Sequence, residues 1–374
     1  MILLVTTKTE HNFFMREQNP REANYELIRS LGVVQHKSRQ EFLDLMIGGI
    51  MKSRSVQFCE IANSINRPIK TESLERQIQD FFQKTEIDYR QLMVYFLCFI
   101  HHDGLQLSID RTEWDFGKTQ INVLCVIVSI GKMGVPLYFE MLDNKSGNSN
   151  WEDRISLFKE IIGVVGISRI ELLTMDREFI GHKWLNWLKF QKIDFCVRVP
   201  KSHTIRLLSG EILKAEAILK EEGSTCFESV VVDGVIVNCS ISVDKNGDLL
   251  YLIGTLKPSA LKPFYKKRWT IEVFFQALKG RGFNLEQSRL RCLKKYRKLF
   301  AIACMAYTLC WAVGIEAAKN DPVKPKKHGY PQFSGFRRGL NLFRKYFKNQ
   351  ILEPIIRIFD LAFWRLSNFP EIIG

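Results

Sequence analysis

Apolar residues recur at helical spacing through the first hundred residues of the chain. Phe42, Met46 and Ile50 fall on one face of a helix. Residues 71–82 predict a further helix, with a threonine N-cap at its start and acidic residues in its first turn. Residues 1–100 are therefore predicted to form an N-terminal helical module. It is either a DNA-binding or dimerisation module or a plain helical cap on the core.

The pattern changes to strand spacing after residue 104. Three strands are predicted as an antiparallel meander, at 105–110, 121–130 and 135–142. Helices and strands then alternate: helix 151–165, strand 169–176, helix 179–191 and strand 193–199. The order β-β-β-α-β-α-β is typical of an RNase H-like α/β core with a mixed five-stranded sheet.

A second set of strands interrupts this core. The insertion, 200–258, is β-rich, with alternating strands at 226–232, 235–243 and 249–255. Two helices at 262–281 and 293–318 follow, and a basic, Pro-rich linker leads to a helical tail. The predicted domains are the N-terminal helical module, two parts of the core, the insertion and a basic C-terminal tail: 1–100, 101–199 and 259–320, 200–258, and 321–374.

The positive charge of the chain is concentrated in its last third. The net charge is +14, and residues 257–374 hold 24 Lys and Arg against 7 Asp and Glu, whereas residues 1–256 hold 30 against 33. A basic segment of this kind favours a polyanionic partner, nucleic acid before membrane. No apolar run is expected to span a bilayer. The nine cysteines lack zinc-site spacing and are expected to be buried thiols in a reducing cytosol.

One stripe of polar side chains stands out on the helix predicted at 262–281. At about 100° per residue, Tyr265, Arg268, Glu272 and Lys279 fall within about 60° of one another, with apolar residues on the opposite side. A solvated helix face normally scatters alternating charges. A single acid beside two bases and a phenol suits a carboxylate that binds a cation while its neighbours bind phosphates.

Two further acids are candidates for the same site. Asp110 and Asp176 each end a predicted buried strand, and strand ends meet ligands at the edge of an open sheet. Together with Glu272 they would form an oxygen-ligand site for Mg²⁺ or Mn²⁺, with room for two ions that serve phosphodiester chemistry. The alternative for either aspartate alone is a cap on a turn or a following helix.

The spacing Tyr265-x2-Arg268-x3-Glu272-x6-Lys279 resembles the Y-x2-R-x3-E-x6-K signature of the DDE transposases of the insertion sequence four family. Asp110 and Asp176 resemble the first and second acids of that family. The resemblance covers about residues 40–345 and includes the β-rich insertion before the third acid.

This resemblance implies a DNA transposase that binds terminal inverted repeats and target DNA as a homodimer in a synaptic complex. Asp110, Asp176 and Glu272 would hold the catalytic metal ions. A metal-activated water would nick the DNA, and the freed 3′-hydroxyl would attack the opposite strand or the target. Tyr265, Arg268 and Lys279 would contact phosphates near the cleaved end. Such an enzyme is expected in the bacterial cytoplasm, at the nucleoid.

The chain departs from the family pattern at two positions. Gln276 stands where some members carry a further basic residue one turn after the glutamate. Members that form hairpin ends stack a flipped base on a Trp in the last strand of the insertion. Tyr251 is the nearest match, as a base-stacking DNA contact or as an ordinary strand aromatic. Trp184 and Trp187 are expected in or near the core.

Three other functions fit parts of this pattern. A catalytically inactive DNA-binding relative could act as a transposition regulator, and it would be free to lose any of the three acids. A nuclease could have the same core without strand transfer. A carboxylate glycosidase would leave the basic last third unexplained.

Overall fold

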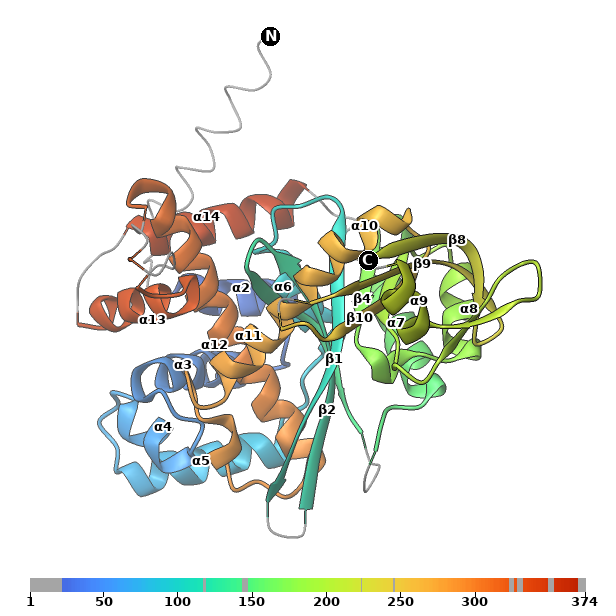
Figure 1. Ribbon diagram of the computed structural model, residues 1–374. Coiled ribbons are helices and arrows are strands. Elements are labelled where there is room, and N and C mark those ends of the chain that lie inside the picture. The colour runs from blue at the N-terminus through green and yellow to red at the C-terminus, as the bar shows by residue number, and fades with distance from the viewer. Residues whose placement is uncertain are drawn as a thin grey trace. The chain divides into compact units, whose positions relative to one another are not determined.

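The computed structural model describes residues 22–116, 119–142, 147–222, 224–244, 246–322, 326–327, 332–348 and 353–368. These residues form two compact units, which are described separately (Figure 1). The first unit contains the described residues up to His101, the segment Trp114–Ile121 and the described residues from Phe275 onward. The second contains His102–Glu113 and Asn122–Phe274.

The first unit is built mainly from helices. Its N-terminal helices are α2 (Ala23–Leu31), α3 (Lys37–Ser53), α4 (Phe58–Ser64), α5 (Thr71–Lys84) and α6 (Tyr89–Leu97). Its later helices are α12 (Leu293–Asn320), α13 (Gly335–Tyr346) and α14 (Glu353–Asn368), with a short turn at η4 (Leu285–Gln287). The helices predicted within residues 1–100 are confirmed for the described residues of that range. The predicted cap is wrong, because Thr71 is already inside α5 and Lys70 precedes it without a side-chain cap.

Helix α12 is the central core element of the first unit. It is 28 residues long, and by length and composition it could cross a membrane, which corrects the expectation that no segment could. However, 94% of its most apolar window is buried inside the protein, as expected of a core helix. It packs along α13, and the two backbones approach closely at Gly314 and Gly339.

A ten-stranded mixed sheet organises the second unit. The strands that precede the insertion are β1 (Leu105–Phe116), β2 (Thr119–Ile130), β3 (Met133–Met141), β4 (Ile170–Met175) and β5 (Phe195–Arg198). The others are β6 (Thr204–Arg206), β7 (Ile212–Lys214), β8 (Thr225–Val232), β9 (Val235–Val243) and β10 (Leu249–Gly254). Their order across the sheet is β3-β2-β1-β4-β5-β10-β9-β8-β6-β7. Strands β1, β4 and β5 are parallel.

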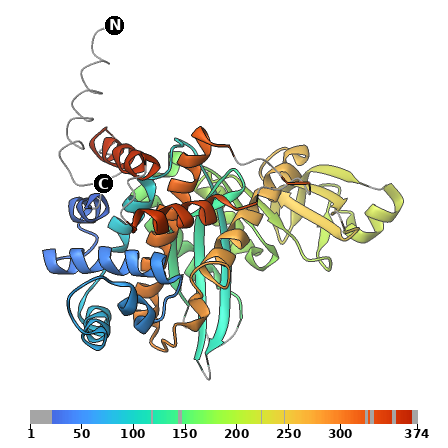
Figure 2. The same ribbon diagram turned by 90° about the vertical axis from the view of Figure 1, so that its left-hand side faces the viewer.

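The prediction of a five-stranded sheet is wrong, because the insertion extends the sheet. Strand β10 pairs antiparallel with β5, where Leu252 lies opposite Arg198, and β9 and β8 continue from it. Figure 2 shows these strands of the insertion in yellow and yellow-green. An unpaired edge at β5 would leave backbone N–H and C=O groups without partners, and pairing with β10 satisfies them. The short strands β6 and β7 and helix α9 (Ala215–Glu222) were not predicted.

The helices of the second unit largely follow the predicted pattern. Helix α7 (Trp151–Val165) has the predicted bounds and begins at a capping box formed by Asn150 and Asp153. Helix α8 (His182–Phe190) carries Trp184, which is fully buried and stacks on Trp187 with 5.5 Å between ring centroids, as expected. Short 3-10 turns lie at η1 (Ile167–Arg169) and η2 (Arg177–Phe179).

The single helix predicted at 262–281 is three elements instead. Helix α10 (Pro258–Tyr265) ends in a 3-10 turn, η3 (Lys266–Arg268), and α11 (Trp269–Leu278) follows. The Thr270 hydroxyl donates to the carbonyl of Lys267 at 2.8 Å, which gives that carbonyl a side-chain partner in the tightened turn.

The cysteines are all free thiols, and six of the nine are buried. The expectation of buried thiols is wrong for Cys226 and Cys292, which are exposed.

Candidate active site

Two of the predicted acids lie where the pairing of two neighbouring parallel strands ends. Strand β1 continues past Asp110 to Phe116, so the prediction that the strand ends at this residue is wrong. The parallel register with β4 nevertheless ends at the pair Ile109 and Met175. Asp110 directly follows Ile109, and Asp176 directly follows Met175, so the two aspartates lie side by side where the pairing of β1 with β4 ends.

The third acid joins them through two polar side chains. Arg268 Nη1 donates to Asp110 Oδ2 at 2.9 Å, and its Nη2 donates to Glu272 Oε1 one turn further along the chain. Tyr265 Oη donates to Asp176 Oδ1 at 3.2 Å. Three acids separated by 66 and 96 residues in sequence therefore surround one guanidinium and one phenol, all within the second unit.

Burial and neighbouring charges shift the pKa values of Asp110 and Arg268. Burial raises the pKa of Asp110 to about 6; Arg268 opposes that rise, and Asp176 and Glu178 reinforce it. Burial acts to lower the pKa of Arg268, but the Tyr265 phenol and the three carboxylates outweigh it and raise that pKa above its ordinary value. Arg268 is therefore a permanent cation in contact with two acids.

A chain of hydroxyl groups lies beneath the three acids. Ser108, Thr174 and Thr270 each come two residues before one of the acids, and all three are buried. Ser108 Oγ lies 2.7 Å from Thr174 Oγ1 and 2.9 Å from Ser129 Oγ, and Ser129 Oγ lies 2.8 Å from Thr270 Oγ1. These hydroxyl contacts link β1, β4, β2 and α11, so they fix the elements that carry the acids relative to one another.

A fourth acid, Glu178, lies beside the cluster and was missed from the sequence. Both of its carboxylate oxygens lie 3.4 Å from Arg111 Nε, next to Asp110. Arg154, which is buried, donates to the Glu178 carbonyl at 2.9 Å and to Ser149 Oγ at 2.9 Å. Burial raises the pKa of Glu178. The sequence signal for this residue is the run Asp176-Arg177-Glu178 directly after a buried strand. The contacts of Glu178 with Arg111 and Arg154 hold the turn that follows Asp176.

The other two predicted DNA contacts have different surroundings. Lys279 belongs to the first unit, where its Nζ lies 2.9 Å from Glu286 and 5.0 Å from the centroid of the Trp114 ring. Tyr251 is fully buried in β10, and its hydroxyl has no hydrogen-bond partner among the described residues. In this conformation no face of the Tyr251 ring is open to a base, so a stacking role would need the strand to open.

Residues 102–309 match the model of the transposase DDE domain. The chain belongs to this family. It is thus a DDE transposase, an enzyme that cuts and joins DNA, and all three acids of the cluster fall inside the matched range. No protein of curated function matches the sequence.

Two solved structures show a distant likeness to this transposase. One is a piggyBac transposase synaptic complex with hairpin DNA, with a TM-score of 0.42 and 12% identity over 89% of this chain and 76% of that chain. Another is endonuclease V from Bacillus subtilis, with a TM-score of 0.22 and 11% identity over 62% of this chain and 90% of that chain.

DDE transposases use divalent metal ions, and the acids of the cluster fit such an ion by donor type. Two aspartates and a glutamate supply only carboxylate oxygens, which Mg²⁺ and Mn²⁺ prefer. Among the described residues no three acids, His or Cys are close enough together to hold an ion as they stand. The Arg268 guanidinium forms ion pairs with both Asp110 and Glu272. By donor type the three acids fit a divalent metal ion, and the Arg268 guanidinium contacts two of them in this conformation.

Proposed function

We propose that this transposase belongs to the insertion sequence four group and binds the terminal inverted repeats of its element. Its catalytic residues for DNA cleavage and strand transfer are Asp110, Asp176 and Glu272. What supports the proposal is the meeting of these three acids around Arg268 and Tyr265, two further residues of the same sequence signature. If the polar side chains of this helix formed only a solvent-exposed face, acids from distant parts of the chain would not be expected to contact Arg268 and Tyr265.

The RNase H-like assignment of the core is part of this proposal. The strands that precede the insertion follow the order β3-β2-β1-β4-β5, with β1, β4 and β5 parallel. This order supports the assignment, and the insertion then adds strands at the β5 side. The proposed enzyme acts as a homodimer in a synaptic complex with its ends and target DNA, in the bacterial cytoplasm.

The proposed cofactor is Mg²⁺ or Mn²⁺, with two ions held by Asp110, Asp176 and Glu272. A bound metal supplies an activated water or 3′-hydroxyl and stabilises the leaving oxygen of the phosphodiester. The protein orients the acids through the hydroxyl chain beneath them. Arg268 and Tyr265, once released from the acids, offer a bidentate fork and a single donor to phosphate oxygens, and Lys279 offers a point charge.

Replacing Arg268 with Ala should strengthen metal binding by the DNA-free protein, by about tenfold in affinity for Mn²⁺. The reason is that Asp110 and Glu272 lose a competing cation that lies 2.9 Å from Asp110. The measurement is a Mn²⁺ titration followed by electron paramagnetic resonance. The same substitution should slow DNA cleavage, since a phosphate contact is lost.

Arg268→Lys is the matched control, because it keeps the positive charge. It should bind Mn²⁺ close to the wild-type affinity. If Arg268→Ala binds Mn²⁺ no better than the wild-type protein, the guanidinium does not compete with metal at this site.

DNA binding by the full chain should weaken by about a thousandfold or more between about 50 and 200 mM salt, since neutralising many phosphates releases counterions. The last third of the chain, with 24 Lys and Arg, supplies the cations. Fluorescence anisotropy with labelled end DNA measures the slope. A flat response to salt would argue against this basic region as the DNA contact.

A further inference from the structure

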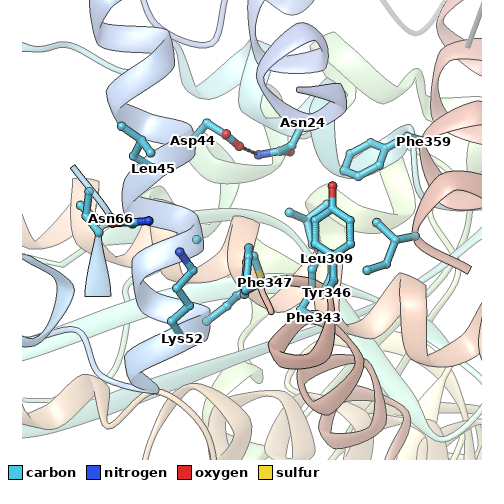
Figure 3. Close-up of a pocket in the computed structure, with 14 residues that line it drawn as sticks. Asn24, Asp44, Leu45, Lys52, Asn66, Leu309, Phe343, Tyr346, Phe347 and Phe359 are labelled. Carbon is cyan, nitrogen blue, oxygen red and sulfur yellow. Dashed lines mark hydrogen bonds between the residues drawn. The ribbon is translucent and has the colours of Figure 1, made fainter. Parts of the chain in front are cut away.

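A cavity of about 330 Å³ lies inside the first unit, and no residue of the acid cluster lines it (Figure 3). Its lining comes from α2, α3, α12, α13 and α14 and from the segments next to α4 and α13. Cavities of this size hold small organic molecules, above all where a few polar groups converge in an apolar wall. Four aromatic rings form much of its wall: Phe343, Tyr346, Phe347 and Phe359.

The most unusual group in the cavity is Asp44 of α3. Its Oδ1 accepts a hydrogen bond from Asn24 Nδ2 at 2.5 Å. Tyr95 Oη donates to Asn24 Oδ1 at 2.7 Å, so the amide is oriented with its NH₂ group toward Asp44. Burial raises the pKa of Asp44 to about 6, which leaves the carboxyl mostly ionised at neutral pH.

Among the described residues, Asp44 has no counter-cation. Asn24 is its hydrogen-bond partner, and among the described residues no Lys, Arg or His forms an ion pair with it. Asp44 is only partly exposed, so its carboxylate has lost part of its water shell without gaining a cation, which is destabilising. A cation in the cavity would relieve that cost.

The cationic side chain that lines the cavity with Asp44 is Lys52, and it already has partners. Lys52 is eight residues after Asp44, about 12 Å further along the helix axis. Its ammonium lies 4.7 Å from the centroid of the Phe347 ring and donates to the Ser64 carbonyl at 3.4 Å. Gly48 lies between the two charged residues and leaves the cavity open there. Figure 3 shows Asp44 and Asn24 along one side, with the Phe347 and Tyr346 rings across from them.

We propose that this cavity binds an organic ammonium ion, with the ammonium group on Asp44 and an aromatic or apolar body against Phe347 and Tyr346. The carboxylate provides the counter-charge, and the ring faces attract both the cation and its apolar body. An anionic ligand would be repelled by Asp44, and Lys52, the one cation among the described residues that line the cavity, already has partners. The ammonium group comes either from a free amine or from a lysine side chain of a polypeptide.

Three probes of similar shape test the charge preference by calorimetry on the full chain at neutral pH: 2-phenylethylamine, 2-phenylethanol and 3-phenylpropanoate. The amine should bind at least about tenfold more tightly than the alcohol, and the carboxylate most weakly. A fourth probe, Nα-acetyl-lysine amide, distinguishes the sources, since tighter binding than that of 2-phenylethylamine would assign the site to a lysine side chain. Equal binding of the three shape-matched probes, or no amine binding below about 10 mM, would overturn the proposal.

Two variants locate the binding within this cavity. Asp44→Asn keeps the shape of the side chain and removes its charge, so the preference for amine over alcohol should disappear. Gly48→Leu should weaken both probes, because a Cβ at this position lies 3.8 Å from the Phe347 ring and the rest of the side chain would occupy the cavity. Asp80→Asn, at an exposed acid that pairs with Lys84, is the control and should bind as wild type. An Asp44→Asn protein that still prefers the amine would contradict the assignment.

Discussion

Asp110→Asn, Asp176→Asn and Glu272→Gln should each slow metal-dependent DNA cleavage by about a thousandfold or more. Each substitution removes one charged oxygen ligand and leaves the shape of the side chain nearly unchanged. The effect should be close to complete for any one of the three, because residues that hold a metal together act as a unit. The measurement is the initial rate of nicking of end DNA under single-turnover conditions.

Binding of the same DNA should change little in these variants, since the cations that contact phosphates remain in place. Glu171→Gln is the matched control, because Glu171 is an exposed acid on β4, the strand that leads to Asp176. It should cleave at the wild-type rate. Full activity in any of the three site variants would remove that residue from the metal site.

Gly339→Ala should lower the free energy of unfolding of the first unit by about 3 kcal/mol, a large effect for a single methyl group. A Cβ at Gly339 would lie 1.7 Å from the Cys310 carbonyl oxygen, and one at Gly314 would lie 1.8 Å from the Gly335 carbonyl oxygen. Both contacts involve backbone atoms, so relief requires α12 and α13 to move apart. Urea denaturation followed by circular dichroism measures the loss.

Gly163→Ala provides the comparison for this prediction. Gly163 lies within α7, and a Cβ there would meet no atom within 4 Å. This variant should be as stable as the wild-type protein or more stable, since Ala favours a helix over Gly by about 1 kcal/mol. Equal stability of Gly339→Ala and Gly163→Ala would show that α12 and α13 do not depend on close backbone contact.

Strong periodicity made much of the fold predictable. The capped, amphipathic segment of α7 gave correct bounds, and the apolar runs of β2 and α12 identified buried elements. The sequence could not show that β10 pairs with β5, because alternation identifies a strand but not its neighbour. Strands of three residues, such as β6 and β7, are too short to carry a period at all.

The acid cluster was predictable for a different reason. Asp176 directly follows an apolar run, and Glu272 belongs to a spaced set of polar residues, so each stood out locally. The guanidinium bridge from Arg268 to Asp110 could not be predicted, because it joins residues 158 positions apart. The same holds for the cavity around Asp44, whose walls come from helices at both ends of the chain.

The most direct test of the central claim is cleavage of the element's own ends. Purified wild-type protein is incubated with duplex DNA that carries the terminal inverted repeats, with Mg²⁺, and the products are resolved on a denaturing gel. We expect nicks at the element end and joined strands, both absent with EDTA and with Glu272→Gln. Intact DNA, or cleavage that persists without metal or with Glu272→Gln, would contradict a DDE transposase acting at these three acids.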